Sequence, residues 1–399
     1  MTFFYMRFVD DWLGMPLCSL IGRIIQIKNY FLPIKTEIDA NKVKTILCQK
    51  YFGMGTILHA IPLIRALKQH YPNAKIIFMT LESNREIVQL IQMVDEVLTI
   101  RLDSLGILIR GVLSNIMYLL QQRIDISIDL EFFSKFTMIV SFLCNAKIRV
   151  GLHQKRIRPE GIMTHNIYYN HYKHISEIYF AFTNAFGIER KQEYFASYLP
   201  SLRNSQEKVL RKKFGLKHDV QIVIINVNAS ELFKFRRWPS SYFIELVELL
   251  IQRYPNFYYI FIGGKSDCKY VEEIYQSIDN RNDRLINCAG QTNIKELVAL
   301  IEMAYLMISN DSGPMHIASL CSVNLVAFFG PETPVVYGPI NENALVFSPN
   351  GLYCSPCMSI YDSKKSLYAE ECLENECLTN VKPKEVFEMI ENRFLNQTR

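Results

Sequence analysis

The sequence lacks a hydrophobic run long enough to cross a membrane. The longest uncharged stretch near the N-terminus is WLGMPLCSLIG, residues 12–22, which is shorter than the roughly 18 apolar residues that a spanning helix needs. A secretory signal peptide is not expected either, because Asp10 and Asp11 precede the apolar part and no small-residue cleavage site follows it. We therefore expect a cytoplasmic location, where the ten cysteines are reduced thiols or metal ligands rather than disulfides.

The chain also lacks a strong charge of either sign, a repeat of fixed period and any low-complexity tract. Its net charge is +5 and its pI is near 8.5. This weak basic balance does not indicate nucleic-acid binding, but it suits an anionic ligand or a membrane surface. With 49% hydrophobic and 21% charged residues the protein is globular, and 399 residues suffice for two or three domains.

What the sequence does contain is a regular alternation of short apolar runs and helical patterns. Strands are expected at 43–49, 75–80, 96–100, 125–130 and 147–152, and again at 220–227, 257–264, 284–290, 304–309 and 323–330. Because these strands are apolar on both faces and helical patterns separate them, they predict parallel sheets covered by helices. The polar stretch 201–208 is expected to be a linker between two doubly wound, Rossmann-like α/β units.

The expected domains are an N-terminal helical extension over 1–41, units over 42–200 and 201–382, and a closing helix over 383–399. In the extension, apolar residues recur at helical spacing at Leu20, Ile21, Ile24, Ile27 and Phe31. This pattern fits a helix packed on the main body. It fits equally an amphipathic helix in an anionic leaflet, with Trp12 and Tyr30 at the level of the lipid headgroups.

The stretch SNDSGPMHIA, residues 309–318, marks the end of a strand and the start of a helix. Ligands of open parallel sheets bind beyond the carboxyl ends of the strands. Gly313 allows close backbone approach, and Pro314 suits the first helical turn. The free N–H groups of such a helix start favour a phosphate, and His316 can donate to the same anion. The alternative is an ordinary strand–turn–helix corner with a packed histidine.

Three other strand ends of the same unit carry polar residues. The turn after 220–227 contains Asn228 and leads to Arg236 and Arg237, whose guanidinium groups suit a diphosphate. Asp267 follows two glycines and can accept from ribose hydroxyls, and Thr292 lies at the next corner. Each signal has a structural alternative, a basic surface or a turn cap, but together the four corners predict a nucleotide-binding site.

These residues resemble a known family. SNDSGPMHIASLCSVNLVAFFGPETPVVYGP, the first corner YFGMGTILHAIPLIRALKQHYPNAKI and the motif FRRWP are similar to glycosyltransferase family 9, the bacterial heptosyltransferases. The resemblance implies a GT-B fold, with the nucleotide-sugar in the C-terminal domain and the acceptor at the N-terminal domain. It also implies transfer of a sugar to lipopolysaccharide or a related anionic glycolipid, with inversion and without a catalytic metal, at the inner face of the inner membrane.

The resemblance further implies roles for single residues. Arg236 is expected to meet phosphate, Asp267 the ribose and Thr292 the base. The diphosphate and sugar are expected to contact Asp311, Ser312, Gly313 and His316. Gly53 and Gly55 of the first corner are expected on the acceptor side. Apart from the resemblance, the basic residues Arg149 and Lys155 suit a phosphorylated acceptor or, equally, a solvated basic loop. His174 is expected either in the acceptor site or as a helix cap.

One departure concerns the general base. The family carries an aspartate at the glycine corner, where this chain has Thr56 in the sequence Gly53-Met54-Gly55-Thr56. Thr56 cannot take up a proton at neutral pH, so we expect another base or an altered activity. Glu131 follows a strand end, where a carboxylate can accept the proton of an acceptor hydroxyl. His59, in the helix after the corner, is the second candidate.

The last cysteines form the pattern C-x2-C-x14-C-x4-C, with thiols at Cys354, Cys357, Cys372 and Cys377. This spacing suits a structural zinc site, and reduced thiols or a disulfide are the alternatives. Two other functions remain open at this point. One is a nucleotide-sugar 2-epimerase of the same fold, and the other is a non-catalytic family member, which Thr56 favours.

Overall fold

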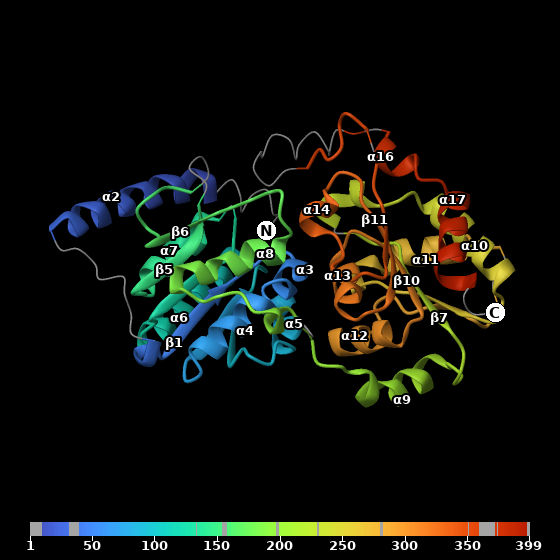
Figure 1. Cartoon of the computed structure of the whole chain (residues 1–399), viewed down its shortest axis with the longest axis horizontal. Helices are drawn as coiled ribbons and strands as arrows, with labels where there is room; N and C mark the ends of the chain where they lie inside the picture. The colour runs from blue at the N-terminus through green and yellow to red at the C-terminus, as the bar shows by residue number, and fades with distance from the viewer. Residues whose placement is uncertain are drawn as a thin grey trace. The chain divides into compact units, whose positions relative to one another are not determined.

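The computed structural model describes residues 10–31, 40–132, 134–153, 158–196, 199–229, 231–279, 282–349, 351–358, 372 and 374–396. The chain divides into two compact units, Met1–Tyr198 and Leu199–Arg399. Each unit contains its own six-stranded sheet with helices packed around it (Figure 1). The expected α/β architecture with two parallel, doubly wound sheets is therefore confirmed.

The sheet of the first unit has the order β3-β2-β1-β4-β5-β6, and all its strand pairs are parallel. Its strands are β1 (Thr45–Gln49), β2 (Lys75–Leu81), β3 (Glu96–Ile100), β4 (Ile126–Asp129), β5 (Ile148–His153) and β6 (His165–Tyr168). Every residue of β1 and β4 is buried. This explains why the central strands read as continuous apolar runs, since helices cover both faces of the sheet.

Seven helices and several short turns surround this sheet in the described part of the unit. The helices are α2 (Met15–Phe31), α3 (Met54–Leu58), α4 (Ile61–His70), α5 (Arg85–Gln89), α6 (Leu105–Gln122), α7 (Lys135–Leu143) and α8 (Ile175–Phe180). Leu119 of α6 and Val140 of α7 pack in one cluster with Leu47 and Ile77 of the sheet, so α6 and α7 cover the same face.

The helix α2 is fixed to the unit through α7. Cys18 and Ile25 are buried against Met138 of α7. The carboxylate of Asp10, in the helical turn η1 (Asp10–Gly14), accepts hydrogen bonds from the backbone N–H groups of Lys135 (2.9 Å) and Phe136 (2.8 Å). These are orphan donors of the first turn of α7, so the N-terminal segment caps that helix from a distance.

The second unit repeats the design with the strand order β12-β11-β10-β7-β8-β9, again with parallel pairs throughout. Its strands are β7 (Ile222–Asn226), β8 (Tyr258–Phe261), β9 (Leu285–Asn287), β10 (Leu306–Asn310), β11 (Asn324–Phe328) and β12 (Ala344–Phe347). The strands β7 and β10 are buried at every position and pair with each other, so they form the centre of the sheet.

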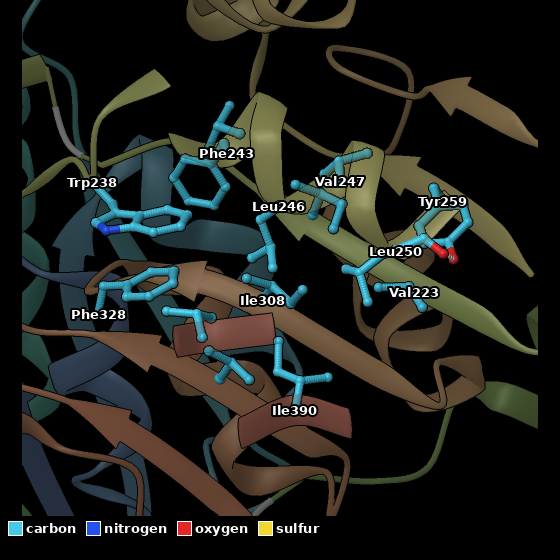
Figure 2. Packing of buried hydrophobic residues seen from close by; sticks show 14 of the residues in the cluster. Val223, Trp238, Phe243, Leu246, Val247, Leu250, Tyr259, Ile308, Phe328 and Ile390 are labelled. Atoms are coloured by element: carbon cyan, nitrogen blue, oxygen red, sulfur yellow. Dashed lines mark hydrogen bonds between the residues drawn. The ribbon is translucent and has the colours of Figure 1, made fainter. Parts of the chain in front are cut away.

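The described helices of this unit are α9 (Arg203–Phe214), α10 (Ser240–Arg253), α11 (Cys268–Gln276), α12 (Ile294–Met303), α13 (Gly313–Leu320), α14 (Pro334–Tyr337), α16 (Glu376–Thr379) and α17 (Pro383–Ile390). Figure 2 shows the core between the sheet and α10 and α17. Trp238 stacks on Phe328 of β11 with ring centroids 4.3 Å apart, next to Phe243 of α10. Ile390 brings α17 into the same cluster.

Most predicted elements lie within a few residues of the observed ones. The structure differs from the prediction in a linker, in two edge strands and in one helix. The expected linker 201–208 is wrong, because α9 begins at Arg203. The edge strands β6 and β12 were not predicted. The expected helix 57–70 is two helices, α3 and α4, with a break at His59 and Ala60. Among the described residues no helix combines the length and the hydropathy that crossing a bilayer requires.

Candidate active site

The strand order of the second unit brings the predicted ligand corners together. Because β10 pairs with both β7 and β11, their carboxyl ends are neighbours. Asn226 ends β7, Asn310 ends β10, and Glu332 follows β11 by four residues. Residues that are about a hundred positions apart in the sequence therefore meet at one edge of the sheet, as expected for a doubly wound fold.

Arg236 lies at the centre of this edge. Its guanidinium is 3.1 Å from the Asp311 carboxylate and 3.3 Å from the Glu332 carboxylate. The Nε atom of Arg236 is buried and makes no hydrogen bond among the described residues, and the same holds for Oδ1 of Asn228. Buried polar atoms of this kind are normally satisfied by water or a ligand. The cluster thus offers a guanidinium donor for an additional anionic group.

Trp238 holds Arg236 in place. The indole is fully buried, its backbone N–H donates to the side chain of Asn310 (2.8 Å), and its ring N–H donates to the carbonyl of Val381 (3.0 Å). The short turn η6 (Glu231–Arg236) is thereby tied to the end of β10. Arg237 points elsewhere, with its guanidinium over the ring of Tyr270 at 4.3 Å. The two neighbouring arginines therefore have different surroundings.

The two carboxyl groups at this edge are both difficult to ionise. The pKa of Glu332 is raised to about 7, mainly by burial, which outweighs the lowering effect of Arg236 and is assisted by the nearby Asp311. Burial also raises the pKa of Asp311, against the effect of Arg236. Two buried carboxyls thus share one arginine, and the pair can retain a proton near neutral pH.

The stretch SNDSGPMHIA forms the end of β10 and the start of α13. Ser312 is the N-cap residue, and its hydroxyl accepts a hydrogen bond from the amide of Asn226 at 2.8 Å. The Nε2 atom of His316 is 3.9 Å from Asp311 Oδ1, inside the first turn of the helix. Asn310, Asp311 and Ser312 therefore connect β7, η6 and α13. Gly313 and Pro314 start the helix, whose first N–H groups are oriented to favour an anion.

The two remaining corners adjoin this edge. A side chain at Gly263 would meet Asn228 at 2.9 Å and Asp267 at 3.1 Å, so the ends of β7 and β8 are in close contact. Asp267 accepts a hydrogen bond from the backbone N–H of Gly264 (2.9 Å) and thus closes its own turn. Gly290 donates to the carbonyl of Gly263, which places the corner with Thr292 beside β8. Contacts of Asp267 and Thr292 with a nucleotide remain predictions.

The glycine corner of the first unit has a distinct backbone. Gly53 has φ of 83°, a left-handed conformation that favours glycine, and an added Cβ would lie 2.7 Å from the Thr56 hydroxyl. That hydroxyl donates to the carbonyl of Gly53 at 2.7 Å. Gly55 is buried in α3. Thr56 therefore stabilises the turn itself, and no acid or base stands at its position.

Glu131 reaches the same corner from the end of β4. One carboxylate oxygen pairs with the ammonium of Lys50 at 2.9 Å, and the other accepts from the N–H groups of Tyr51 (2.6 Å) and Phe52 (2.9 Å). The side chain is buried. These bonds hold the chain segment that leads into Gly53, so Glu131 positions the corner. Its function as general base stays a prediction.

The two histidines predicted for this side are in contact. The rings of His59, at the C-terminal end of α3, and His174, the N-cap residue of α8, lie edge to face with centroids 4.8 Å apart. The Nδ1 atom of His174 is 2.8 Å from the Ser176 hydroxyl. His59 is fully buried. The role of His59 as an alternative general base and the contact of His174 with the acceptor substrate both stay predictions.

Arg149 and Lys155 were predicted to contact the acceptor. Arg149 is buried in β5 and donates to the carbonyls of Ile162 and Ala146, both at 2.7 Å. These bonds give it a structural task, and acceptor binding stays a prediction. Lys155 lies outside the described residues.

The described residues contain no group of three or more histidines, cysteines or acids arranged to hold a metal ion. Cys354, Cys357, Cys372 and Cys377 are free thiols. They influence one another electrostatically, and burial is the main cause that raises the pKa of Cys377 to about 12. The geometry of the described residues therefore gives the expected zinc site no support.

Comparison with known proteins identifies the family. The model of glycosyltransferase family 9 (heptosyltransferase) matches residues 113–368, which is more than half of the chain. The chain belongs to glycosyltransferase family 9. Its enzyme class is therefore that of the glycosyltransferases, as the sequence motifs indicated.

Relatives and solved structures agree with this assignment. The lipooligosaccharide heptosyltransferase 2 of Campylobacter jejuni is 30% identical over 55% of this chain and 76% of that protein. The lipopolysaccharide heptosyltransferase 3 of Escherichia coli is 26% identical over 73% of this chain and 84% of its own length. The structure of the E. coli ADP-heptose lipopolysaccharide heptosyltransferase II has a TM-score of 0.69 at 20% identity, covering 90% of this chain and all of that one. The expected GT-B fold is thereby confirmed.

Two residues of these strand-end clusters were missed from the sequence. Glu332 completes the pair of carboxyls around Arg236, and Lys50 pairs with Glu131. Lys50 directly follows β1, and Glu332 follows the turn Gly330-Pro331 after β11. The rule that ligand residues follow strand ends could have identified them, since it identified Asp267 and Asp311.

Proposed function

We propose that this chain transfers a heptose from a nucleotide-diphosphate donor to the core oligosaccharide of a lipopolysaccharide or lipooligosaccharide, with inversion and without a catalytic metal. The observation that carries the proposal is Arg236, held between Asp311 and Glu332 beside the start of α13. Such a cluster suits a diphosphate, and it lies at the end of the sheet where ligands of this fold bind. The names of the relatives supply the sugar and the acceptor.

Each candidate site residue of the second unit has a proposed role. Arg236 and the N–H groups of α13 bind the diphosphate, and His316 donates to the same group. Asn228, whose Oδ1 is buried without a hydrogen bond among the described residues, and Ser312 orient the donor. Asp267 accepts from the ribose and Thr292 lies near the base. Such oriented donors stabilise the negative charge that develops on the leaving diphosphate.

The first unit supplies the acceptor side. Inversion in one step requires a base within hydrogen-bond reach of the acceptor hydroxyl. We propose Glu131 for this task, because Oε2, which accepts from Lys50, has a second lone pair, whereas Oε1 already accepts from both corner amides. His59 is the alternative base, and Gly53, Gly55, Arg149, Lys155 and His174 are proposed to form the acceptor side.

The test combines binding and transfer. Thermal shift with a panel of nucleotide-sugars is expected to single out ADP-heptose, the donor named for the E. coli enzyme. Mass spectrometry is then expected to detect one added heptose on a heptose-deficient core acceptor. The proposal fails if no donor in the panel stabilises the protein, or if another sugar is transferred instead.

A second candidate function is a donor-binding protein without transfer activity. It is favoured by Thr56, whose hydroxyl is directed to the carbonyl of Gly53 where the family has an acid. In that case ADP-heptose would stabilise the protein, but no acceptor would be modified.

Two further points belong to the same proposal. We infer that the chain works at the cytoplasmic face of the inner membrane, attached through η1 and α2, because Trp12 of η1 and Leu20, Ile24, Ile27 and Phe31 of α2 are exposed. The four C-terminal cysteines are proposed to serve as reduced thiols, the state in which the structure has them. Stoichiometric zinc in the purified protein, measured by elemental analysis, would contradict this second point.

A further inference from the structure

The helix α6 carries an exposed apolar stripe. Its members are spaced by four or three residues and are 41–59% exposed: Leu105, Ile109, Leu113, Met117 and Leu120. At this spacing they lie along one side of the helix. Large apolar side chains gathered in this way on a protein surface usually mark a contact with a partner or a membrane.

The stripe is not required for packing of the unit. A different side of α6 fulfils that task, because Leu119 is buried and Leu108 and Val112 are partly buried in the core of the first unit. The helix also has its own N-cap, since the hydroxyl of Ser104 accepts from the N–H of Ile107. The exposed residues therefore add nothing that the fold needs.

The charge of the helix indicates what covers the stripe. Neither α6 nor α2 contains an aspartate or a glutamate, and their only charged residues are Arg23, Lys28 and Arg110. Cations beside apolar residues suit a surface of anionic lipids. A second copy of the chain docked through the same stripe would bring like charges together, which disfavours that contact.

The position of α6 supports the same partner. Both α6 and α2 pack on α7, and the exposed stripe of α2 includes Leu17, Leu20, Ile24 and Ile27. In each helix the exposed stripe runs beside the residues that pack on the unit. The two exposed stripes therefore belong to helices that pack on the same helix of the first unit.

We propose that α6 is a second membrane-contact element, which rests with α2 on an anionic leaflet through its apolar stripe. This inference depends on the proposed function in one respect, namely that the acceptor is a lipid-linked glycan. Two contact elements would hold the first unit in a defined orientation, whereas α2 alone leaves it free to rotate about one helix.

The test uses the full chain and flotation with vesicles of phosphatidylglycerol and phosphatidylethanolamine. In the variant Leu113→Asp/Met117→Asp two negative charges replace exposed apolar side chains. The apparent affinity for the vesicles, obtained from the bound fraction, is therefore expected to fall at least about tenfold. Leu113→Gln/Met117→Gln should weaken binding less but in the same direction. The matched control is Val209→Asp/Met389→Asp, two exposed apolar residues on helices of the second unit, which should leave binding unchanged.

Three results would overturn the proposal. The first is that the α6 variants bind vesicles as the unmodified protein does. The second is that the Asp and the Gln variants both lose binding only because they also lose their folding transition. The third is that sedimentation velocity shows a dimer which the variants dissociate, while their vesicle binding is unaltered. Transfer to a delipidated core acceptor separates this proposal from the proposed function. It should be unaffected by the α6 variants, and if the unmodified protein also fails to transfer, the proposed function fails while the vesicle result stands.

Discussion

The carboxyl group of Glu332 is the clearest case in which a single residue links stability to pH. It is buried beside Asp311 and Arg236, and its pKa is raised to about 7 from an ordinary value of 4.5. A carboxyl with a raised pKa in the folded state binds its proton more tightly there than in the unfolded chain. Its contribution is complete below about pH 4.5 and is lost as the pH rises to about 7.

The free energy of unfolding should therefore contain a component that falls by about 3 kcal/mol between these pH values. Glu332→Gln, which cannot ionise, should remove this decline, so the variant should gain stability relative to the unmodified protein as the pH rises. Urea denaturation at a series of pH values measures the difference. Glu342→Gln, in the loop before β12, is the control. Parallel pH profiles for Glu332→Gln and the unmodified protein would contradict the prediction.

Arg236 should account for much of the affinity for the donor diphosphate. Arg236→Ala is expected to weaken ADP binding by about 1.5–3 kcal/mol, the range for a charge-assisted hydrogen bond. Because this change also leaves Asp311 and Glu332 without their cation, Arg236→Lys is the gentler variant; it keeps the charge and loses the planar fork.

Calorimetry with ADP measures both variants. The matched control is Arg237→Ala, the adjacent arginine that stacks on Tyr270, and its ADP affinity should be nearly unchanged. Equal losses in the Arg236 and Arg237 variants would mean that the effect is not local to the diphosphate.

Glu131 is predicted to be the general base. Glu131→Gln should retain donor affinity and lower turnover by roughly 10²–10⁴, while Thr56→Ala should cost much less because its hydroxyl donates to backbone carbonyls of its own turn and cannot act as a base. The decisive measurement is the pH dependence of turnover. If Glu131 merely positions the corner through Lys50, Tyr51 and Phe52, the acidic limb of the profile will persist in the variant.

At the scale of elements, the segment from η6 to α10 connects the core with the site. Trp238 lies directly after the two arginines, stacks on Phe328 and is fully buried. Trp238→Ala should lower the free energy of unfolding by about 3–5 kcal/mol and also weaken ADP binding, since Arg236 loses its anchor.

The chain contains two tryptophans, and the other provides the control. Trp12 is 70% exposed, so Trp12→Ala should change the free energy of unfolding by no more than about 0.5 kcal/mol. Chemical denaturation compares the two variants. A Trp238 variant that is destabilised but binds ADP normally would show that Arg236 does not depend on this anchor.

The central elements could be predicted because burial on both faces leaves long apolar runs. The helix α9 could not, since no apolar residue lies between Leu202 and Val209. It forms because Glu302 of α12 accepts from the N–H groups of Leu202 and Arg203, both at 2.8 Å. The edge strand β6 has one buried residue, Ile167. Such elements depend on tertiary contacts, which local patterns do not contain.

In the candidate site, too, the residues at strand ends could be predicted, but the contacts between distant residues could not. Strand ends could be recognised from the sequence, so Arg236, Asp311 and Asp267 could be predicted as candidates. The pairing of Glu131 with Lys50 joins residues 81 positions apart, and that of Arg236 with Glu332 joins residues 96 positions apart. Only the strand order determines which ends become neighbours, and composition and periodicity leave that order open.

At the scale of the whole molecule, the exposed helices should make membrane attachment visible in fluorescence. In a Trp238→Phe background Trp12 is the remaining tryptophan. Its emission should shift to shorter wavelength with anionic vesicles, because the indole moves from water to the headgroup region. Zwitterionic vesicles should produce a smaller shift, and high salt should reduce the effect. An emission maximum that does not move would place α2 away from the lipid.

The bond between Asp10 and α7 also has a consequence for the order of events during synthesis. Asp10 caps Lys135, which lies 125 residues later. At typical rates of translation the N-terminal helix leaves the ribosome on the order of ten seconds before α7 does. In that interval its entire apolar circumference is available, including Cys18 and Ile25, which the finished fold buries. A ribosome-bound nascent chain that stops before α7 should therefore bind anionic vesicles more tightly than the completed protein, so the bilayer can capture the chain before its first domain has folded.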